Sequence, residues 1–177
     1  RDIYETADHK EIEQNYGKAV QAMYPIKGKR TRHYAFYDEL DIKQLSEDRL
    51  MEDVFEDALK NGEFQLWYQP KVDPVTGNIL GAEALIRWKR PDGTMLSPGK
   101  FIPLFEKNGN ITTLDEYVFR TVCAQQQRWL QAGAKLYPIS VNISRVSLYY
   151  SNVVDKYREL LNSFQLDPKY VPLEITE

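Results

Sequence analysis

Apolar and polar residues alternate in four short segments of this chain, which is the pattern of strands buried on one face. The first two segments flank the turn Asp73–Asn78, which has a length and composition that fold one strand back on the other. The sequence therefore predicts an antiparallel hairpin at this point. The four predicted strands are Phe64–Gln69, which Pro70 ends, Ile79–Trp88, Tyr137–Ser144 and Val171–Thr176.

Apolar residues recur at helical spacing in five longer segments. They predict helices over residues 5–26, 47–60, 97–108, 114–132 and 149–164. Between the first two helices the sequence predicts a basic turn at 27–32, a short strand at 33–37 and a polar linker at 38–46. The helix over 97–108 begins after Ser97 and ends at Asn108-Gly109, which are typical residues for those positions.

The order of these elements predicts an α/β fold, because strands joined through long helices pair in parallel. A barrel and an open sheet both fit the alternation. The alternation stops at Glu177, and so few strands do not close a barrel, so we expect an incomplete fold. Arg1 stands where a natural start would have Met, which indicates a piece of a longer protein.

Composition and charge exclude two classes of partner. The net charge is −3, so duplex nucleic acid is not expected. No apolar run approaches the roughly 20 residues of a membrane span, although a membrane tether upstream of this segment stays open. Cys123 is the single cysteine and falls on an apolar helical face, which favours core packing and a reducing cytoplasm.

Gly81–Trp88 combines an apolar strand pattern with two charged residues. Residues two apart on a strand share a face, so Glu83, Leu85 and Arg87 point the same way. Buried charges are costly unless they pair or bind a metal or ligand. Two interpretations follow, a Glu–Arg ion pair at the end of the strand and a functional site.

The same alternation in the other strands brings one polar residue from each to one face of the sheet. These residues are Gln69, Glu83, Asn142 and Glu174. Carboxylate and amide oxygens suit a hard divalent cation such as Mg²⁺ or Mn²⁺, and Arg87 could bind a phosphate through two hydrogen bonds. This set predicts metal-assisted phosphoryl chemistry, and a polar interior satisfied by internal hydrogen bonds is the alternative.

Five blocks of this sequence resemble the EAL domain, a family of bacterial phosphodiesterases that hydrolyse cyclic di-GMP to the linear dinucleotide pGpG. They are Tyr68-Gln-Pro-Lys71, Gly81–Trp88 with its Glu83-Ala84-Leu85 signature, Ser97–Pro103, Ser140–Arg145 and Leu173–Glu177. The resemblance implies a modified TIM barrel whose first strand is antiparallel to the rest. Residues 46–177 would then be the N-terminal half of an EAL domain.

The resemblance also implies roles for individual residues. Glu83, Asn142 and Glu174 resemble the metal ligands of the family, and Glu177 ranks second because alternation puts it on the other face. Gln69, Leu85 and Arg87 resemble residues on the substrate side, with Arg87 near a phosphate. Ile102 and Pro103 resemble the segment that packs against a guanine base, and helix core is an equal alternative for them.

Residues 1–45 resemble, more weakly, the last helix and strand of a GGDEF domain, which often precedes an EAL domain. The cues are the helix through Ala19–Met23, Lys27-Gly28 and Tyr37-Asp38. The catalytic residues of the GGDEF family are not in this sequence, so we infer no cyclase activity.

The resemblance is incomplete, because the family's aspartate pair, catalytic lysine and later glutamates would follow Glu177. We therefore expect this chain to be inactive by itself and its parent protein to be a metal-dependent cyclic di-GMP phosphodiesterase. Two alternatives remain. One is a receptor that binds cyclic di-GMP without cleaving it, and the other is an interaction or regulatory module in which the helices over 5–26 and 47–60 serve as dimer or signalling connectors. The resemblance also implies a homodimer through the EAL domain.

Overall fold

The computed structural model describes residues 9–23, 42–149 and 152–175, and the chain divides into two compact units, Arg1–Leu50 and Met51–Glu177. The first unit contains helix α1 (His9–Met23), where the sequence predicts a helix over 5–26. The predicted basic turn at 27–32 and strand at 33–37 lie outside the described residues. The second unit carries the sheet and its covering helices.

Helix α2 (Ile42–Lys60) begins five residues before the predicted start. The linker prediction over 38–46 is therefore wrong from residue 42 onward. This segment is polar, but it contains good helix formers, and the Gln44 amide donates to Asp48 one turn later at 2.6 Å. Polarity indicates exposure here, and an exposed segment can still be helical.

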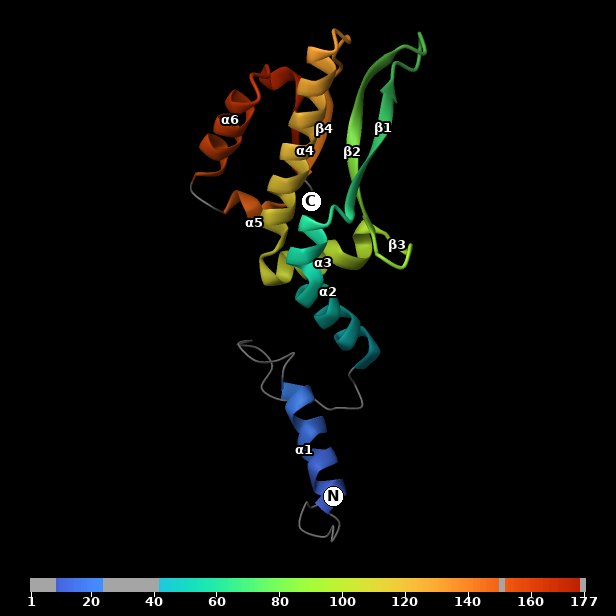
Figure 1. Cartoon of the computed structure of the whole chain (residues 1–177), viewed down its shortest axis with the longest axis vertical. Coiled ribbons are helices and arrows are strands. Elements are labelled where there is room, and N and C mark those ends of the chain that lie inside the picture. The colour runs from blue at the N-terminus through green and yellow to red at the C-terminus, as the bar shows by residue number, and fades with distance from the viewer. Residues whose placement is uncertain (1–8, 24–41, 150–151, 176–177) are drawn as a thin grey trace. The chain divides into compact units, whose positions relative to one another are not determined.

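One mixed sheet forms the centre of the Met51–Glu177 unit (Figure 1). Its strands are β1 (Phe64–Val72), β2 (Ile79–Lys89), β3 (Met95–Leu96), β4 (Ile139–Ile143) and β5 (Leu173–Ile175). The order is β1-β2-β4-β5, with β3 paired to β2. β1 and β2 are antiparallel, whereas β2, β4 and β5 are parallel, as the sequence predicts.

Strand β1 continues through Pro70 to Val72, so the prediction that Pro70 ends this strand is wrong. Proline lacks an amide hydrogen and is tolerated in a strand that has a neighbour on one side only. β1 is such an edge strand, because β2 is its one partner within the described sheet. The extension adds Lys71 to the paired part of the hairpin.

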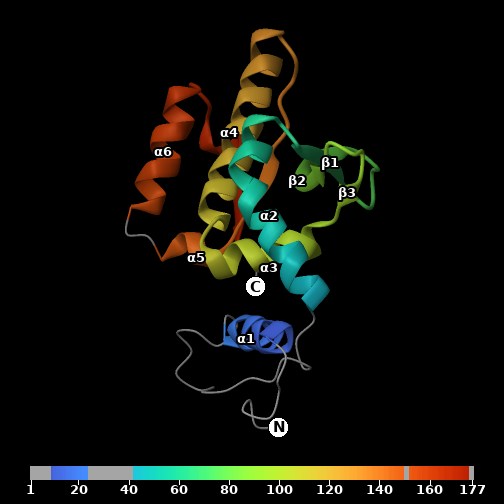
Figure 2. The same cartoon turned by 60° about the horizontal axis from the view of Figure 1, so that its bottom comes forward.

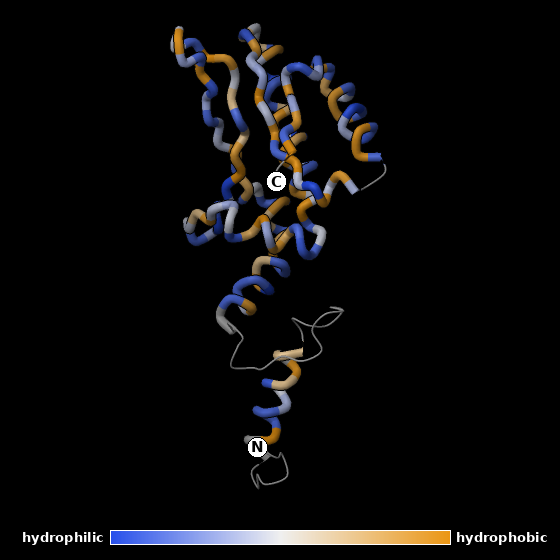
Figure 3. The backbone as a smooth tube through the Cα atoms, turned by 180° about the vertical axis from the view of Figure 1, so that it is seen from behind, coloured by the Kyte–Doolittle hydropathy of each residue, from blue (hydrophilic) through white to orange (hydrophobic). Residues whose placement is uncertain are grey.

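Helices α4 (Ile111–Gln131) and α6 (Val153–Ser163) cover one face of the sheet. Residues of α4, β4 and α6 form a hydrophobic cluster that includes Val122, Cys123, Val141 and Leu160. Seen from behind, the strands lie in front of these helices (Figure 3). The predicted helix over 149–164 corresponds to α6, and the 3₁₀ turn Pro168–Tyr170 follows it. A short helix that the sequence analysis did not predict, α5 (Arg145–Leu148), precedes α6.

A second cluster packs the C-terminal part of α2 and helix α3 (Pro98–Asn108) against one end of the sheet (Figure 2). It is mostly aromatic, and the rings of Phe64 and Trp88 lie 4.7 Å apart between their centroids. α3 begins after Ser97 and ends at Gly109, whose φ of +88° is left-handed. Among the described residues, no helix is both long and apolar enough to cross a membrane.

Candidate functional site

The sheet face opposite α4 collects the polar residues that alternation singles out. Gln69 of β1 is the register partner of Glu83 of β2, and Glu83 is the register partner of Ser140 of β4. Asn142 of β4 is the register partner of Glu174 of β5. Because partners in adjacent strands share a face, four strands deliver these side chains to one surface.

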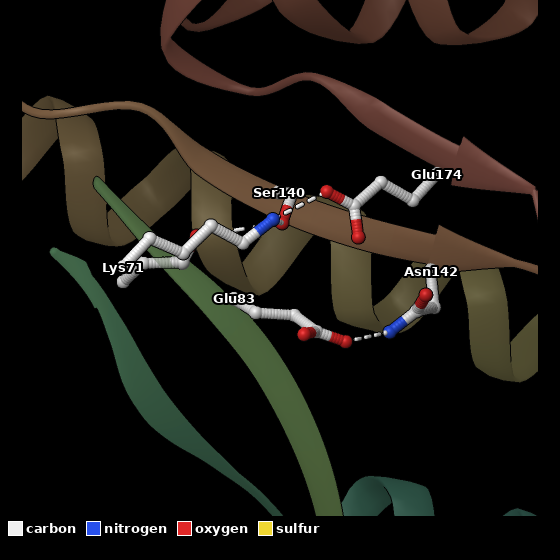
Figure 4. A network of polar contacts seen from close by, with 6 residues as sticks. Lys71, Glu83, Ser140, Asn142 and Glu174 are labelled. Atoms are coloured by element: carbon white, nitrogen blue, oxygen red, sulfur yellow. Dashed lines mark hydrogen bonds and ion pairs between the residues drawn. The ribbon is translucent and has the colours of Figure 1, made fainter. Parts of the chain in front are cut away.

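Glu83 and Asn142 are joined directly across this face. The amide nitrogen Nδ2 of Asn142 donates to Oε1 of Glu83 at 2.7 Å (Figure 4). Both side chains are half-buried. This bond fixes the Glu83 carboxylate toward β4, where it faces the same space as Glu174.

Lys71 enters the same site from β1, and the sequence analysis did not select it. Its ammonium group Nζ donates to Oγ of Ser140 at 2.8 Å and to Oε1 of Glu174 at 2.5 Å (Figure 4). The lysine lowers the pKa of the Glu174 carboxyl through this hydrogen bond and its charge. Lys71 is two residues after Gln69, so alternation could have found it had Pro70 not been taken as the end of the strand.

Arg87 lies on the face of Glu83 but does not pair with it. Within the described residues, Nη1 of Arg87 donates to the carbonyl oxygen of Ile86 at 2.9 Å, and Glu83 accepts from Asn142. The strand-end ion pair is therefore the weaker of the two interpretations. The half-buried Arg87 keeps further N–H donors on its planar guanidinium group.

A cavity of about 360 Å³ lies between β2, the end of β4, α3 and the first half of α4. Its volume is in the range of small-molecule pockets. The lining includes three predicted substrate-side residues, Leu85, Ile102 and Pro103, together with Asn142 of the polar face. Ile102 also packs against the aromatic cluster, so it belongs to both the core and the cavity wall.

Asp115 is a buried carboxylate in the cavity wall that sequence reasoning missed. It accepts hydrogen bonds from the backbone N–H of Ser144 at 2.9 Å and from Oγ of Ser147 at 2.6 Å. Burial raises its pKa to about 6, although both hydrogen bonds oppose the shift. The available signal was an acidic residue between Leu114 and Val118 on the apolar face of a helix.

The chemistry of the donors fits a hard divalent cation. Glu83 and Glu174 supply carboxylate oxygens and Asn142 an amide oxygen, which Mg²⁺ and Mn²⁺ prefer to nitrogen or sulfur. Among the described residues, no three or more His, Cys, Asp or Glu side chains lie so that they could hold one metal ion together, so the candidate ligands there are two acids and an amide. Glu177 lies outside the described residues.

The EAL domain family model matches residues 52–177. The chain is 34% identical over 160 residues to the bifunctional diguanylate cyclase/cyclic di-GMP phosphodiesterase MucR of Pseudomonas aeruginosa, a match that covers 90% of this chain and 23% of MucR. It is 35% identical over 122 residues to the probable cyclic di-GMP phosphodiesterase PdeB of Escherichia coli, over 69% of this chain and 23% of PdeB. The chain thus spans less than a quarter of these relatives.

Solved structures agree with the sequence relatives. The PaMucR phosphodiesterase in complex with c-di-GMP aligns with a TM-score of 0.67 at 36% identity, over 72% of this chain and 52% of that one. The FimX EAL domain of Xanthomonas citri aligns with a TM-score of 0.66 at 24% identity, over 77% of this chain and 53% of that one, and shows the shared fold. With its family model covering residues 52–177, this chain belongs to the EAL domain family.

Proposed function

We propose that this chain is part of a metal-dependent phosphodiesterase that hydrolyses cyclic di-GMP to pGpG. One observation carries the proposal: Glu83, Asn142 and Glu174 converge from three neighbouring strands beside a cavity that Asn142 also lines. The names of MucR and PdeB support the substrate. An oxygen-rich face next to a partly apolar pocket suits a ligand with both phosphates and bases.

In this proposal Glu83, Asn142 and Glu174 hold a divalent cation, Mg²⁺ or Mn²⁺. When bound, such a cation activates water and neutralises negative charge that develops on a phosphodiester. Asn142 has a second task, because its Nδ2 hydrogen bond at 2.7 Å keeps the Glu83 carboxylate directed at the site. The donor chemistry supports this assignment, and it does not distinguish the two metals.

The substrate would extend from the polar face into the cavity. Arg87 and Gln69 lie on the face of Glu83 and can donate hydrogen bonds to phosphate oxygens. Leu85, Ile102 and Pro103 give the cavity an apolar wall that suits one face of a guanine ring. We assign these five residues to substrate binding.

The finer architecture is part of the proposal. We infer that residues 46–177 are the first half of a modified TIM barrel, supported by the antiparallel β1–β2 pair and the parallel strands that follow. Residues 1–45 are assigned to the end of a GGDEF-like domain on the sequence resemblance alone. A homodimer through the EAL domain and a cytoplasmic location stay predictions from the sequence.

The test uses the entire natural protein that contains this sequence. With Mg²⁺ or Mn²⁺ it should convert cyclic di-GMP to pGpG, measured by chromatography, and Glu83→Gln should reduce the rate by about 100-fold or more because a ligand charge is lost. Glu159→Gln, an exposed acid on α6, is the matched control and should keep the wild-type rate. Binding of cyclic di-GMP without any product would contradict the proposal and favour a receptor.

A further inference from the structure

A positive side chain of the protein already occupies the acidic face. The Lys71 ammonium group contacts the Ser140 hydroxyl and the Glu174 carboxylate, at 2.8 and 2.5 Å. Glu174 is one of the residues assigned above to the divalent cation. The lysine and a divalent cation would therefore use the same carboxylate.

The backbone arrangement makes room for this lysine. Lys71 lies on β1 and its partners lie on β4 and β5, so its aliphatic chain must pass over β2 (Figure 4). Its partner in β2 is Gly81, which has no side chain to block that path. A Cβ atom at Gly81 would lie 2.5 Å from the carbonyl oxygen of Pro138, so the close approach of β2 and β4 also requires glycine here.

Charge explains why a lysine is useful at this position. Glu83 and Glu174 bring two negative charges to one face, and without a cation they repel each other. Lys71 offsets one of these charges. The side chains of Lys71 and Glu174 are 45% and 43% exposed, so this ion pair can open without disrupting the core.

We propose that Lys71 is an internal counter-cation, which holds Glu174 while the site contains no metal and is released when a divalent cation binds. This inference rests on the proposed cation site and adds that Lys71 regulates the binding of the cation there. Because cation binding must break the Lys71–Glu174 pair, the lysine lowers the affinity for the cation and stabilises the metal-free protein. Ser140 remains as a partner for the released ammonium group.

The experiment measures Mn²⁺ binding to the full chain from the electron paramagnetic resonance signal of free Mn²⁺. Lys71→Met removes the charge and keeps the side-chain length, and we expect about threefold tighter binding, the scale of a half-exposed ion pair. Lys71→Gln should shift affinity in the same direction and serves if the Met variant does not fold. Lys169→Met is the control, since it removes a lysine paired with Asp167 on the 3₁₀ turn. Lys169→Met should change the Mn²⁺ affinity by less than a third as much as Lys71→Met does.

Thermal melting gives a second readout. In EDTA, Lys71→Met should melt about 2 °C below the wild type, because two carboxylates lose their counter-charge. Saturating Mn²⁺ should abolish this difference in melting temperature. If the lysine merely orients Glu174, Lys71→Met should instead bind Mn²⁺ more weakly than the wild type, and the difference in melting temperature should persist in Mn²⁺.

A double variant separates failure of this inference from failure of the proposed function. In a Glu174→Gln background the Lys71→Met change should no longer alter Mn²⁺ affinity, because the carboxylate for which Lys71 and Mn²⁺ compete is absent. If the wild type binds Mn²⁺ and Lys71→Met binds it equally or more weakly, the counter-cation is refuted and the cation site stands. If neither protein binds Mn²⁺ at millimolar concentration, the cation site and the inference both fail.

Discussion

The buried carboxyl group of Asp115 makes the stability of the folded protein depend on pH. Its carboxylate is 7% exposed and accepts both hydrogen bonds, from Ser144 and Ser147, on the same oxygen Oδ2. Burial raises its pKa from the ordinary 3.8 to about 6. The folded protein therefore holds a proton on this residue at pH values where the unfolded chain has released it.

The sign of the pH effect follows from this proton. Between pH 4 and 6 the folded state binds more protons than the unfolded state, so the free energy of unfolding falls as pH rises through that window. The contribution of Asp115 to this fall is about 3 kcal/mol at 1.4 kcal/mol per pKa unit. Below about pH 4 both states are protonated, and above about pH 6 the full cost of the buried charge is present.

Asp115→Asn should remove this fall, because asparagine does not titrate and its Oδ1 can accept both serine hydrogen bonds. Urea titrations at pH 4, 5, 6 and 7 measure the free energy of unfolding. Asp155→Asn replaces an exposed aspartate paired with Arg158 and should retain the decline of the wild type. An undiminished decline in Asp115→Asn would show that other groups cause it.

Residues of the site differ in how far the sequence predicts them. Glu83, Asn142 and Glu174 follow from strand alternation, because a period of two assigns each side chain to a face without knowledge of the fold. Lys71 was missed because Pro70 reads as the end of a strand unless the strand is known to be an edge. Asp115 was missed because its partners, Ser144 and Ser147, come from a distant segment that only tertiary packing brings to α4.

The junction between β2 and β4 depends on one glycine. The carbonyl oxygen of Pro138 accepts from the N–H of Ala82 at 2.9 Å, which sets the register that places Ser140 beside Glu83. The backbones approach so closely that a side chain at Gly81 would meet this carbonyl oxygen. Gly81 therefore controls both strand pairing and the geometry of the polar face.

Gly81→Ala should lower the free energy of unfolding by about 1–3 kcal/mol, because β4 must shift to accept the new Cβ atom. Denaturant titration measures this loss. Gly99→Ala is the matched control, since a Cβ atom at Gly99 meets nothing within 4 Å, and alanine is favoured over glycine in the helix α3. Equal stability of wild type and Gly81→Ala would show that the two strands can separate at little cost.

Element boundaries were harder to predict than element types. The antiparallel hairpin and the parallel pairing of β4 and β5 follow from turn length and from the helices between strands. The start of α2 at Ile42 did not follow, because its first turns lack an apolar stripe and only propensity marks them. The short helix α5 was also missed, because its four residues are too few to show an apolar periodicity.

Two hydrophobic clusters support the Met51–Glu177 unit, and shared residues connect them. One lies between α4, α6 and the parallel strands, and the other is the aromatic cluster at α2 and α3. Ile86 and Tyr117 pack against both. Tyr117 also donates its hydroxyl hydrogen to the backbone carbonyl of Phe64 at 2.9 Å, which ties α4 to the start of β1. These links predict that the two clusters unfold as one unit.

Cys123 makes this cooperativity measurable, because the single cysteine lies fully buried in the first cluster and burial raises its pKa to about 12. Phe105→Ala changes the second cluster and should cost about 3–5 kcal/mol. If the clusters unfold together, labelling of Cys123 by a thiol reagent should accelerate by the factor that denaturant titration gives for the loss of stability, about 100-fold or more. Val75→Ala, on the exposed hairpin turn, should leave labelling unchanged. An unchanged rate in Phe105→Ala would mean that the helix-covered cluster stays folded when the aromatic cluster opens.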